Sequence, residues 1–264
     1  MTPSTCRTGA SSIVAWQRIP DIMRNPVPRI YPLGDEALVC EAPPPATLDV
    51  QRRIWAVAAI ARGWDAVREA VPGMNNLTIT FDALGADAAA LAQALEAAWH
   101  EAHVGDALNP HAANAAATTD IAEGREVEIP VRYGGEAGPD LGAVARHTGL
   151  APADVAARHA AGVYTVFFLG FQPGFAYLGG LDTALHAPRR REPRVAVPAG
   201  SVGIGGAQTG IYPARSPGGW QLIGRTALSL FDPARNPPTL LMPGDRVRFV
   251  IEHIGETVSE ETRA

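Results

Sequence analysis

Three glycine-rich segments in the second half of the chain hold most of the residues suited to ligand binding. The first, residues 167–180, reads FFLGFQPGFAYLGG and places Phe171, Pro173, Phe175 and Tyr177 among its glycines. Glycine permits backbone conformations that other residues avoid, so aromatic side chains on such a loop are free to line a groove. The segment predicts an aromatic substrate site, and a strand pair joined by an aromatic turn is the structural alternative.

The second segment, residues 198–213, suits the binding of an oxyanion. It contains Gly205 and Gly206, followed by the polar side chains of Gln208 and Tyr212. The pattern is not the G-x-G-x-x-G of dinucleotide-binding folds, because Gln208 occupies the third glycine position. Exposed backbone N–H groups in such a run can still cradle a negatively charged oxygen.

Arginines accompany both the second and the third segment. Arg189 and Arg190 precede the second, and the third, residues 216–225, carries Ser216, Trp220 and Arg225. Guanidinium groups bind carboxylates and phosphates through two parallel hydrogen bonds. The arginines therefore predict an anion clamp, with a solvated run of charge as the alternative.

Nucleophilic and metal chemistry have little support in the sequence. The chain contains no G-x-S-x-G nucleophile elbow, and Cys6 and Cys40 fit neither a disulfide framework nor a cysteine-rich zinc site. His100 and His103 lie three residues apart, but no second ligand pair follows at zinc-site spacing, so we expect no metal. His159 lies at the end of a short predicted helix. It either caps the C-terminus of that helix or belongs to a functional site.

The basic residues of this 264-residue chain, 22 in all, are arginines, since the sequence contains no lysine. A P-loop lysine, a Schiff-base lysine and a biotinyl-lysine are excluded, because arginine stays protonated and cannot replace them. The net charge of −5 does not indicate binding to nucleic acid or to an anionic membrane surface. No segment has the apolar length of a membrane span or the apolar core of a signal peptide, which predicts a cytoplasmic protein.

The spacing of apolar residues predicts a small α/β domain followed by a β-rich one. Residues 49–70 have the periodicity of an amphipathic helix, residues 77–81 alternate as a strand does, and residues 87–103 form a second helical pattern. From residue 127 onward the sequence contains short apolar runs separated by glycine and proline. This pattern favours a β-barrel or a β-sandwich.

The predicted boundaries divide the chain into five parts. They are a disordered extension at 1–28, the α/β domain at 29–105, a linker at 106–125, the β-rich domain at 126–252 and a tail at 253–264.

Motifs spread along the chain make it similar to a known family. Beside the three glycine-rich segments they are YPLGDEAL from residue 31, IPVRYGGEAGPDL from residue 129 and MPGDRVRF from residue 242. In this order they resemble the B-type subunit of bacterial 5-oxoprolinase, a family also called Kip inhibitor-like proteins or allophanate hydrolase subunit 1. The resemblance extends from about residue 29 to residue 251.

The resemblance implies an α+β fold, in which a small α/β domain precedes a cyclophilin-like β-barrel. It implies a subunit, inactive alone, of an ATP-dependent hydrolase that opens the lactam 5-oxo-L-proline to L-glutamate. The implied partners are a Kip-associated, C-type subunit with a related barrel and the A-type subunit of 5-oxoprolinase, which bind or share the ATP. No metal or covalent cofactor is implied on this chain. The alternatives are a carboxyltransferase-like component of a urea or allophanate pathway and an inhibitor of a sensor histidine kinase.

The residues singled out above lie in or beside the family-like segments and form one hypothetical site. Its arginines contact an anionic group, its glutamine and a tyrosine orient the substrate, and its histidine carries a proton. The set comprises the catalytic candidates His159, Arg190, Gln208 and Arg225 and the substrate-binding candidates Phe171, Pro173, Phe175, Arg189, Gly205, Gly206, Tyr212, Ser216 and Trp220.

Overall fold

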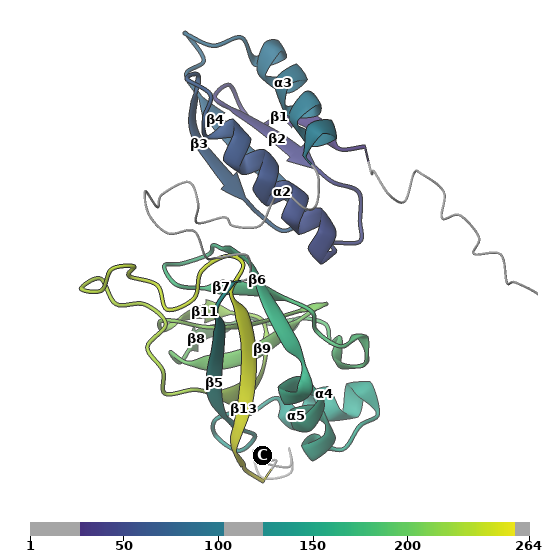
Figure 1. The fold of residues 1–264 in the computed structure, drawn as a ribbon. Coiled ribbons are helices and arrows are strands. Elements are labelled where there is room, and N and C mark those ends of the chain that lie inside the picture. The colour runs from purple at the N-terminus through teal and green to yellow at the C-terminus, as the bar shows by residue number, and fades with distance from the viewer. Residues whose placement is uncertain (1–26, 103–123, 257–264) are drawn as a thin grey trace, which may run out of the picture.

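The computed structural model describes residues 27–102 and 124–256 of the chain. It contains a four-stranded sheet with two helices, followed by a closed β-barrel (Figure 1). The predicted α+β fold, a small α/β part before a barrel, is confirmed. Most of the predicted extension, linker and tail lies outside the described residues. None of the helices in the described part of the chain combines the length and hydropathy that a membrane crossing requires.

The N-terminal sheet has the strand order β1-β2-β4-β3, and all neighbouring strands are antiparallel. Its strands are β1 (Arg29–Pro32), β2 (Ala37–Glu41), β3 (Val67–Pro72) and β4 (Asn76–Phe81). Helices α2 (Leu48–Ala61) and α3 (Ala88–Glu101) pack on one face of the sheet (Figure 1). Buried side chains of both helices form a single core with those of the sheet, among them Ile54, Leu77, Ile79 and Trp99.

The predicted helix over residues 49–70 is wrong in its second half. Helix α2 ends at Ala61, and residues 67–72 form strand β3 beside β4. Gly63 lies in the turn that follows the helix, and its N–H donates to the backbone of the last helical turn. The apolar periodicity continues across this turn, which is why the sequence alone did not separate the helix from the strand.

Seven strands close the barrel in the order β10-β7-β6-β13-β5-β12-β9. They are β5 (Glu126–Tyr133), β6 (Val163–Leu169), β7 (Ala176–Gly179), β9 (Ser201–Gly205), β10 (Gln208–Ile211), β12 (Gln221–Arg225) and β13 (Arg246–Ile254). β13 runs parallel to β5, and the other neighbours are antiparallel.

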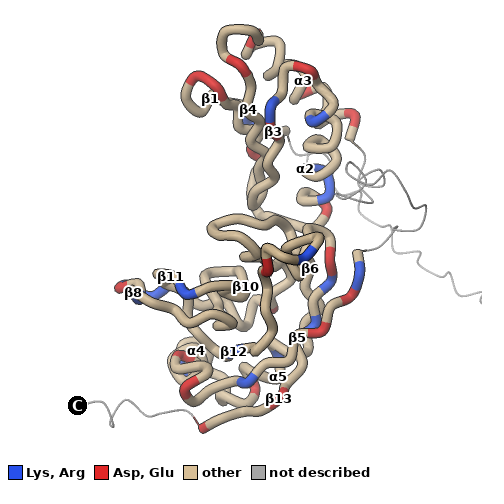
Figure 2. The backbone as a smooth tube through the Cα atoms, turned by 90° about the vertical axis from the view of Figure 1, so that its left-hand side faces the viewer, with Lys and Arg blue, Asp and Glu red and all other residues tan. Residues whose placement is uncertain are grey.

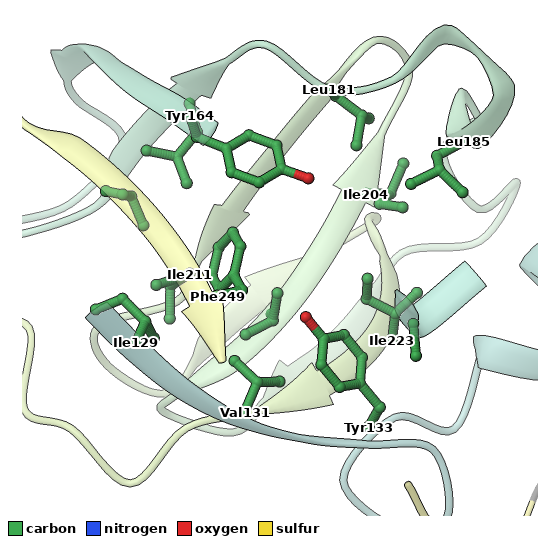
Figure 3. Packing of buried hydrophobic residues seen from close by; sticks show 14 of the residues in the cluster. Ile129, Val131, Tyr133, Tyr164, Leu181, Leu185, Ile204, Ile211, Ile223 and Phe249 are labelled. Carbon is green, nitrogen blue, oxygen red and sulfur yellow. The ribbon is translucent and has the colours of Figure 1, made fainter. Parts of the chain in front are cut away.

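Large side chains fill the inside of the barrel. Alternate residues of a strand face inward, so Ile129, Val131 and Tyr133 of β5 meet Tyr164 of β6 and Phe249 of β13 there (Figure 3). The interior is a packed core, and ligand sites must therefore lie on the outside or at the ends of the barrel.

Several short helices and strands lie outside the barrel. Helices α4 (Leu141–Thr148) and α5 (Pro152–Ala161) pack against it and add buried residues to its core. The strands β8 (Arg194–Val197) and β11 (Ser216–Gly218) pair with each other in a separate sheet that projects from the barrel (Figure 2). The 3-10 helix η1 (Thr183–Leu185) lies on the connection between β7 and β8.

A buried hydrogen bond joins the N-terminal part to the barrel. The indole Nε1–H of Trp55, on α2, donates to the backbone oxygen of Phe167, on β6, at 2.8 Å. This contact holds the helix layer of the N-terminal part against the β6 side of the barrel.

Candidate functional site

A cleft of about 830 Å³ lies between the N-terminal part and the barrel. Pro45, Ala46 and Met74 line it from the N-terminal part, and the barrel side comes from β6, β7, the η1 segment and the β9–β10 turn. We call it the interdomain cleft. Its volume suits a small organic ligand.

A stacked pair of aromatic rings forms the apolar wall of the interdomain cleft. Phe168 of β6 and Tyr177 of β7 have ring centroids 4.3 Å apart and ring planes only 9° apart. Burial raises the pKa of Tyr177, and the charge of nearby Arg189 partly opposes that rise. The Tyr177 hydroxyl is therefore protonated at neutral pH and can donate a hydrogen bond to a ligand.

Five of the residues singled out in the sequence meet at this cleft: Tyr177, Arg189, Gly205, Gly206 and Gln208. Arg189 is exposed, its guanidinium carbon lies 5.8 Å from the Trp220 ring centroid, and it forms no ion pair within the described residues. Gly206 adopts a φ of 69°, which glycine tolerates best. The N–H of Gly206 donates to the backbone oxygen of residue 187 at 2.7 Å, so it is not available to an oxyanion as the glycine run suggested.

Phe175, Tyr212 and Trp220 pack behind the cleft and do not line it. All three are buried, and their rings meet edge to face with centroid distances of 5.3, 5.6 and 6.4 Å. Gly205 makes room for this cluster, because a Cβ there would lie 2.6 Å from Trp220 Nε1. These side chains support the cleft wall, and their predicted contact with a substrate has no support from their position.

Phe171, Pro173 and Ser216 lie away from the residues that line the interdomain cleft. Phe171 is 61% exposed and adopts a φ of 64°, and Pro173 is exposed on the same loop. The hydroxyl of Ser216, on β11, is buried and has no hydrogen-bond partner among the described residues. Their part in substrate binding stays a prediction.

Arg190 pairs with a buried carboxylate. Its Nη1 lies 3.2 Å from Asp140 Oδ1, and Arg194 Nη2 lies 2.7 Å from the same oxygen. The Leu222 N–H donates to Asp140 Oδ2 at 2.7 Å. Asp140 thereby ties the arginine-rich segment to β12 and holds Arg189 beside the cleft. The structure gives Arg190 the place of an anchor, where the sequence predicted contact with an anionic ligand.

His159 lies inside the barrel core with no exposed surface. Its Nδ1 is 2.8 Å from the Tyr133 hydroxyl, and its Nε2 is 2.9 Å from the Thr209 hydroxyl. The Thr209 hydroxyl donates to the Gly203 backbone oxygen, so it must accept from Nε2–H and leave Nδ1 to accept from Tyr133. Burial lowers the pKa of His159 to about 3. A neutral, fully hydrogen-bonded and enclosed ring gives no support to the predicted role as a proton carrier.

Arg225 lies in a different cleft, of about 750 Å³, together with Arg132 and His253. We call this second cavity the basic cleft. The three arginines expected to form one clamp are thus separated, because Arg189 lines the interdomain cleft, Arg190 pairs with a carboxylate and Arg225 lines the basic cleft.

Comparison with known proteins identifies the family. Residues 28–241 match the family described as carboxyltransferase domain, subdomain C and D. A relative from Escherichia coli O157:H7, named as the B-type subunit of 5-oxoprolinase, is 51% identical over 230 residues, which cover 86% of this chain and 97% of the relative. The chain belongs to the family of 5-oxoprolinase B-type subunits. The resemblance drawn from the sequence motifs is therefore confirmed.

Solved structures extend the comparison to the fold of this member of the 5-oxoprolinase family. The crystal structure of TTHA0988 matches with a TM-score of 0.65 at 36% identity, covering 85% of this chain and 41% of that one. The urea amidolyase of K. lactis matches with a TM-score of 0.67 at 22% identity, covering 90% of this chain and 15% of that one. The second likeness shows a shared fold and nothing about shared chemistry.

Phe168 and His186 line the interdomain cleft but were not among the candidate site residues, although Phe168 lies in the first glycine-rich segment. The pairing of β6 with β7 shifts register between Val166 and Phe168, and Phe167 and Phe168 both line the cleft, which simple strand alternation does not predict. The role of Asp140 cannot be assigned from the sequence, because it stands 50 residues before Arg190, its partner. Only the folded chain shows that the two side chains meet.

The side chains that most often hold metal ions are dispersed in the described part of the chain. No group of three or more His, Cys, Asp and Glu gathers within it. Cys40 is buried in the N-terminal core, and burial raises the pKa of its thiol to about 12. The thiol is therefore protonated at neutral pH and packs as a small apolar group.

Proposed function

We propose that this chain acts as the B-type subunit of an ATP-dependent 5-oxoprolinase and that its interdomain cleft binds the lactam 5-oxo-L-proline. One observation carries the choice of cleft. Arg189 is the only Arg, Asp or Glu among the described residues that line it, and it is unpaired there. A cleft with one available cation and apolar walls suits a small monoanion. 5-Oxo-L-proline is such a ligand, because it carries one carboxylate on a neutral lactam ring.

The cleft offers a partner for each part of this substrate. Arg189 binds the carboxylate through its guanidinium group, and the stacked pair of Phe168 and Tyr177 provides an apolar face for the ring. The amide of Gln208 supplies both a donor and an acceptor, which match the C=O and N–H of the lactam. The protonated Tyr177 hydroxyl is a second donor for the carbonyl oxygen, where negative charge develops during amide cleavage.

The proposal includes partner subunits. An unstrained amide is a poor electrophile, and ATP supplies the energy to activate it. This chain contains no lysine for a P-loop, so we expect the ATP to be bound by the partners or shared with them; these partners are a Kip-associated, C-type subunit with a related barrel and an A-type subunit of 5-oxoprolinase. The need for ATP makes the cytoplasm the expected location of the assembly.

ATP-dependent release of glutamate from 5-oxo-L-proline tests the function. The candidate partner subunits are assayed with and without the purified full-length chain. We expect activity only when the chain is present. Association of all three chains without any glutamate release would show that the substrate is wrong, and a failure to associate would exclude a subunit role in this enzyme.

A further inference from the structure

The basic cleft carries a row of three basic side chains from three neighbouring strands. Arg225 of β12 pairs in register with Arg132 of β5, and Arg132 pairs in register with His253 of β13. All three are exposed and line the same cleft of about 750 Å³. Residues in register point to one face of a sheet, so these side chains form a continuous row on the outside of the barrel.

The two arginines of this row form no ion pair in the described part of the chain. Neither Arg132 nor Arg225 forms an ion pair there, whereas Arg248 on the neighbouring β13 pairs with Glu126 at 2.7 Å. Like charges placed directly opposite each other destabilise a sheet. An arrangement that costs stability and is not compensated within the chain is typical of a binding site.

Two carboxylates, Glu136 and Glu252, also line the basic cleft. Neither forms an ion pair with the arginines within the described residues. The guanidinium groups therefore keep their hydrogen-bonding capacity for a ligand.

The orientation of the donors favours an anion with several oxygens. The Nε–H of Arg225 donates to the Ala199 backbone oxygen at 2.9 Å, which fixes the guanidinium plane and leaves its Nη groups without a partner in the described chain. Gly135 borders the same cleft, and its backbone N–H donates to no group of the described chain. Two guanidinium groups, an imidazole and an N–H offer more donors and charge than one carboxylate uses.

We propose that the basic cleft binds a phosphoryl group, either as inorganic phosphate or as the terminal phosphate of a nucleotide. The row lies near the C-terminal ends of β5 and β13, at the end of the barrel away from the N-terminal sheet (Figure 1). It is therefore distinct from the interdomain cleft. The site stands on the barrel alone and does not depend on the proposed lactam chemistry.

Binding of inorganic phosphate to the full-length chain, measured calorimetrically at low ionic strength, tests the site without any other subunit. We expect saturable binding of one phosphate and a weakening of about tenfold or more in Arg132→Gln and in Arg225→Gln, because each loses a charge-assisted hydrogen bond. Arg191→Gln removes an exposed charge outside the basic cleft and is the matched control, with an expected change of less than about twofold.

The melting temperature of the same variants without phosphate gives a second readout. Removal of one of the two opposed charges in Arg132→Gln should leave the fold as stable as before or raise Tm by about 1 °C. A structural role for Arg132 would instead lower Tm, and loss of phosphate binding in an unstable variant would not support the site.

Competition separates the sources of the phosphoryl group. If ADP displaces phosphate, and neither arginine variant binds ADP, the natural ligand of the basic cleft is the terminal phosphate of a nucleotide. If ADP does not displace phosphate, the natural ligand is free phosphate. The proposal is overturned if phosphate shows no saturable binding, if acetate binds as tightly as phosphate, or if Arg191→Gln weakens binding as much as Arg132→Gln.

Discussion

Arg189 is the residue on which the proposed binding of the lactam in the interdomain cleft depends most directly. Arg189→Gln keeps part of the side-chain length and removes the charge, so the substrate carboxylate loses its counter-ion. In the assembled enzyme we expect KM for 5-oxo-L-proline to rise about tenfold or more while kcat changes less, because the contact exists before the transition state. Steady-state kinetics with Arg191→Gln as the control measure this. Equal effects of the two variants would place the carboxylate elsewhere.

His159 makes the stability of the barrel depend on pH. Its pKa is lowered from 6.5 to about 3 in the folded chain, so below pH 6.5 the unfolded chain binds a proton that the folded chain does not. The stabilising effect of the neutral ring is complete above pH 6.5 and is lost as the pH falls towards 3. Between these values the free energy of unfolding should fall by about 1.4 kcal/mol per pH unit from this group alone.

Urea unfolding at a series of pH values checks this, with His159→Gln as the reference for all other titrating groups. Parallel pH profiles of the two proteins would contradict the prediction. If the variant does not fold, the imidazole resonances of the native chain give an independent readout, since they should show no protonation of His159 at pH 5.

At the scale of the element, the turn between β9 and β10 shows two different uses of glycine at adjacent positions. A Cβ at Gly205 would lie 2.6 Å from Trp220 Nε1, whereas a Cβ at Gly206 would meet nothing within 4 Å but would sit at a φ of 69°. Gly205→Ala should cost about 1–3 kcal/mol through overpacking, and Gly206→Ala about 1 kcal/mol through backbone strain. Urea unfolding measures both costs.

Near-UV circular dichroism distinguishes the two mechanisms in this turn. Gly205→Ala should change the aromatic signal, because the Trp220 indole must move, and Gly206→Ala should leave it unchanged. An unchanged signal in Gly205→Ala would show that the Cβ is accommodated without disturbing the aromatic cluster.

Local patterns predicted most elements because these elements are made by near neighbours in sequence. Alternation of Leu77, Ile79 and Phe81 predicted strand β4, and residues 87–103 contain helix α3. Strand β3 was missed because its apolar residues continue the period of the preceding helix. The glycine turn at residue 63 was the available signal, and periodicity outweighed it.

The candidate site was harder to predict because strand pairing decides where each of its residues lies. The structure brings Arg189, Gly205, Gly206 and Gln208 together around one cleft, and their contact with a substrate stays a prediction. The sequence pattern joined Arg225 to them, yet the register of β12 with β5 places Arg225 opposite Arg132 in the basic cleft. No spacing along the chain encodes that register.

At the scale of the whole molecule, the barrel presents two clefts with different electrostatic character. The interdomain cleft has one arginine and an aromatic wall, and the basic cleft has two arginines, a histidine and two glutamates. The packed barrel core separates them, so a ligand in one does not touch the other. With this layout, the small carboxylate and the phosphoryl group proposed as ligands would occupy separate sites.

The interdomain cleft keeps its shape only while the N-terminal part stays in place on the barrel. Trp55→Phe removes the hydrogen bond to the Phe167 carbonyl and retains most of the ring volume. The buried carbonyl then lacks this partner, which should cost about 1–2 kcal/mol of stability. Because Phe167 and Phe168 line the cleft, we also expect KM for the lactam to rise several-fold in the assembled enzyme.

Trp64→Phe is the matched control for this prediction, since the Trp64 indole packs at the edge of the N-terminal core and forms no hydrogen bond within the described residues. It should lower stability to a similar or smaller degree and leave KM unchanged. A loss of stability in both variants with no change of KM in either would mean that the two parts are held together by other contacts. A rise of KM confined to Trp55→Phe would show that the bond from Trp55 to the Phe167 carbonyl maintains the interdomain cleft.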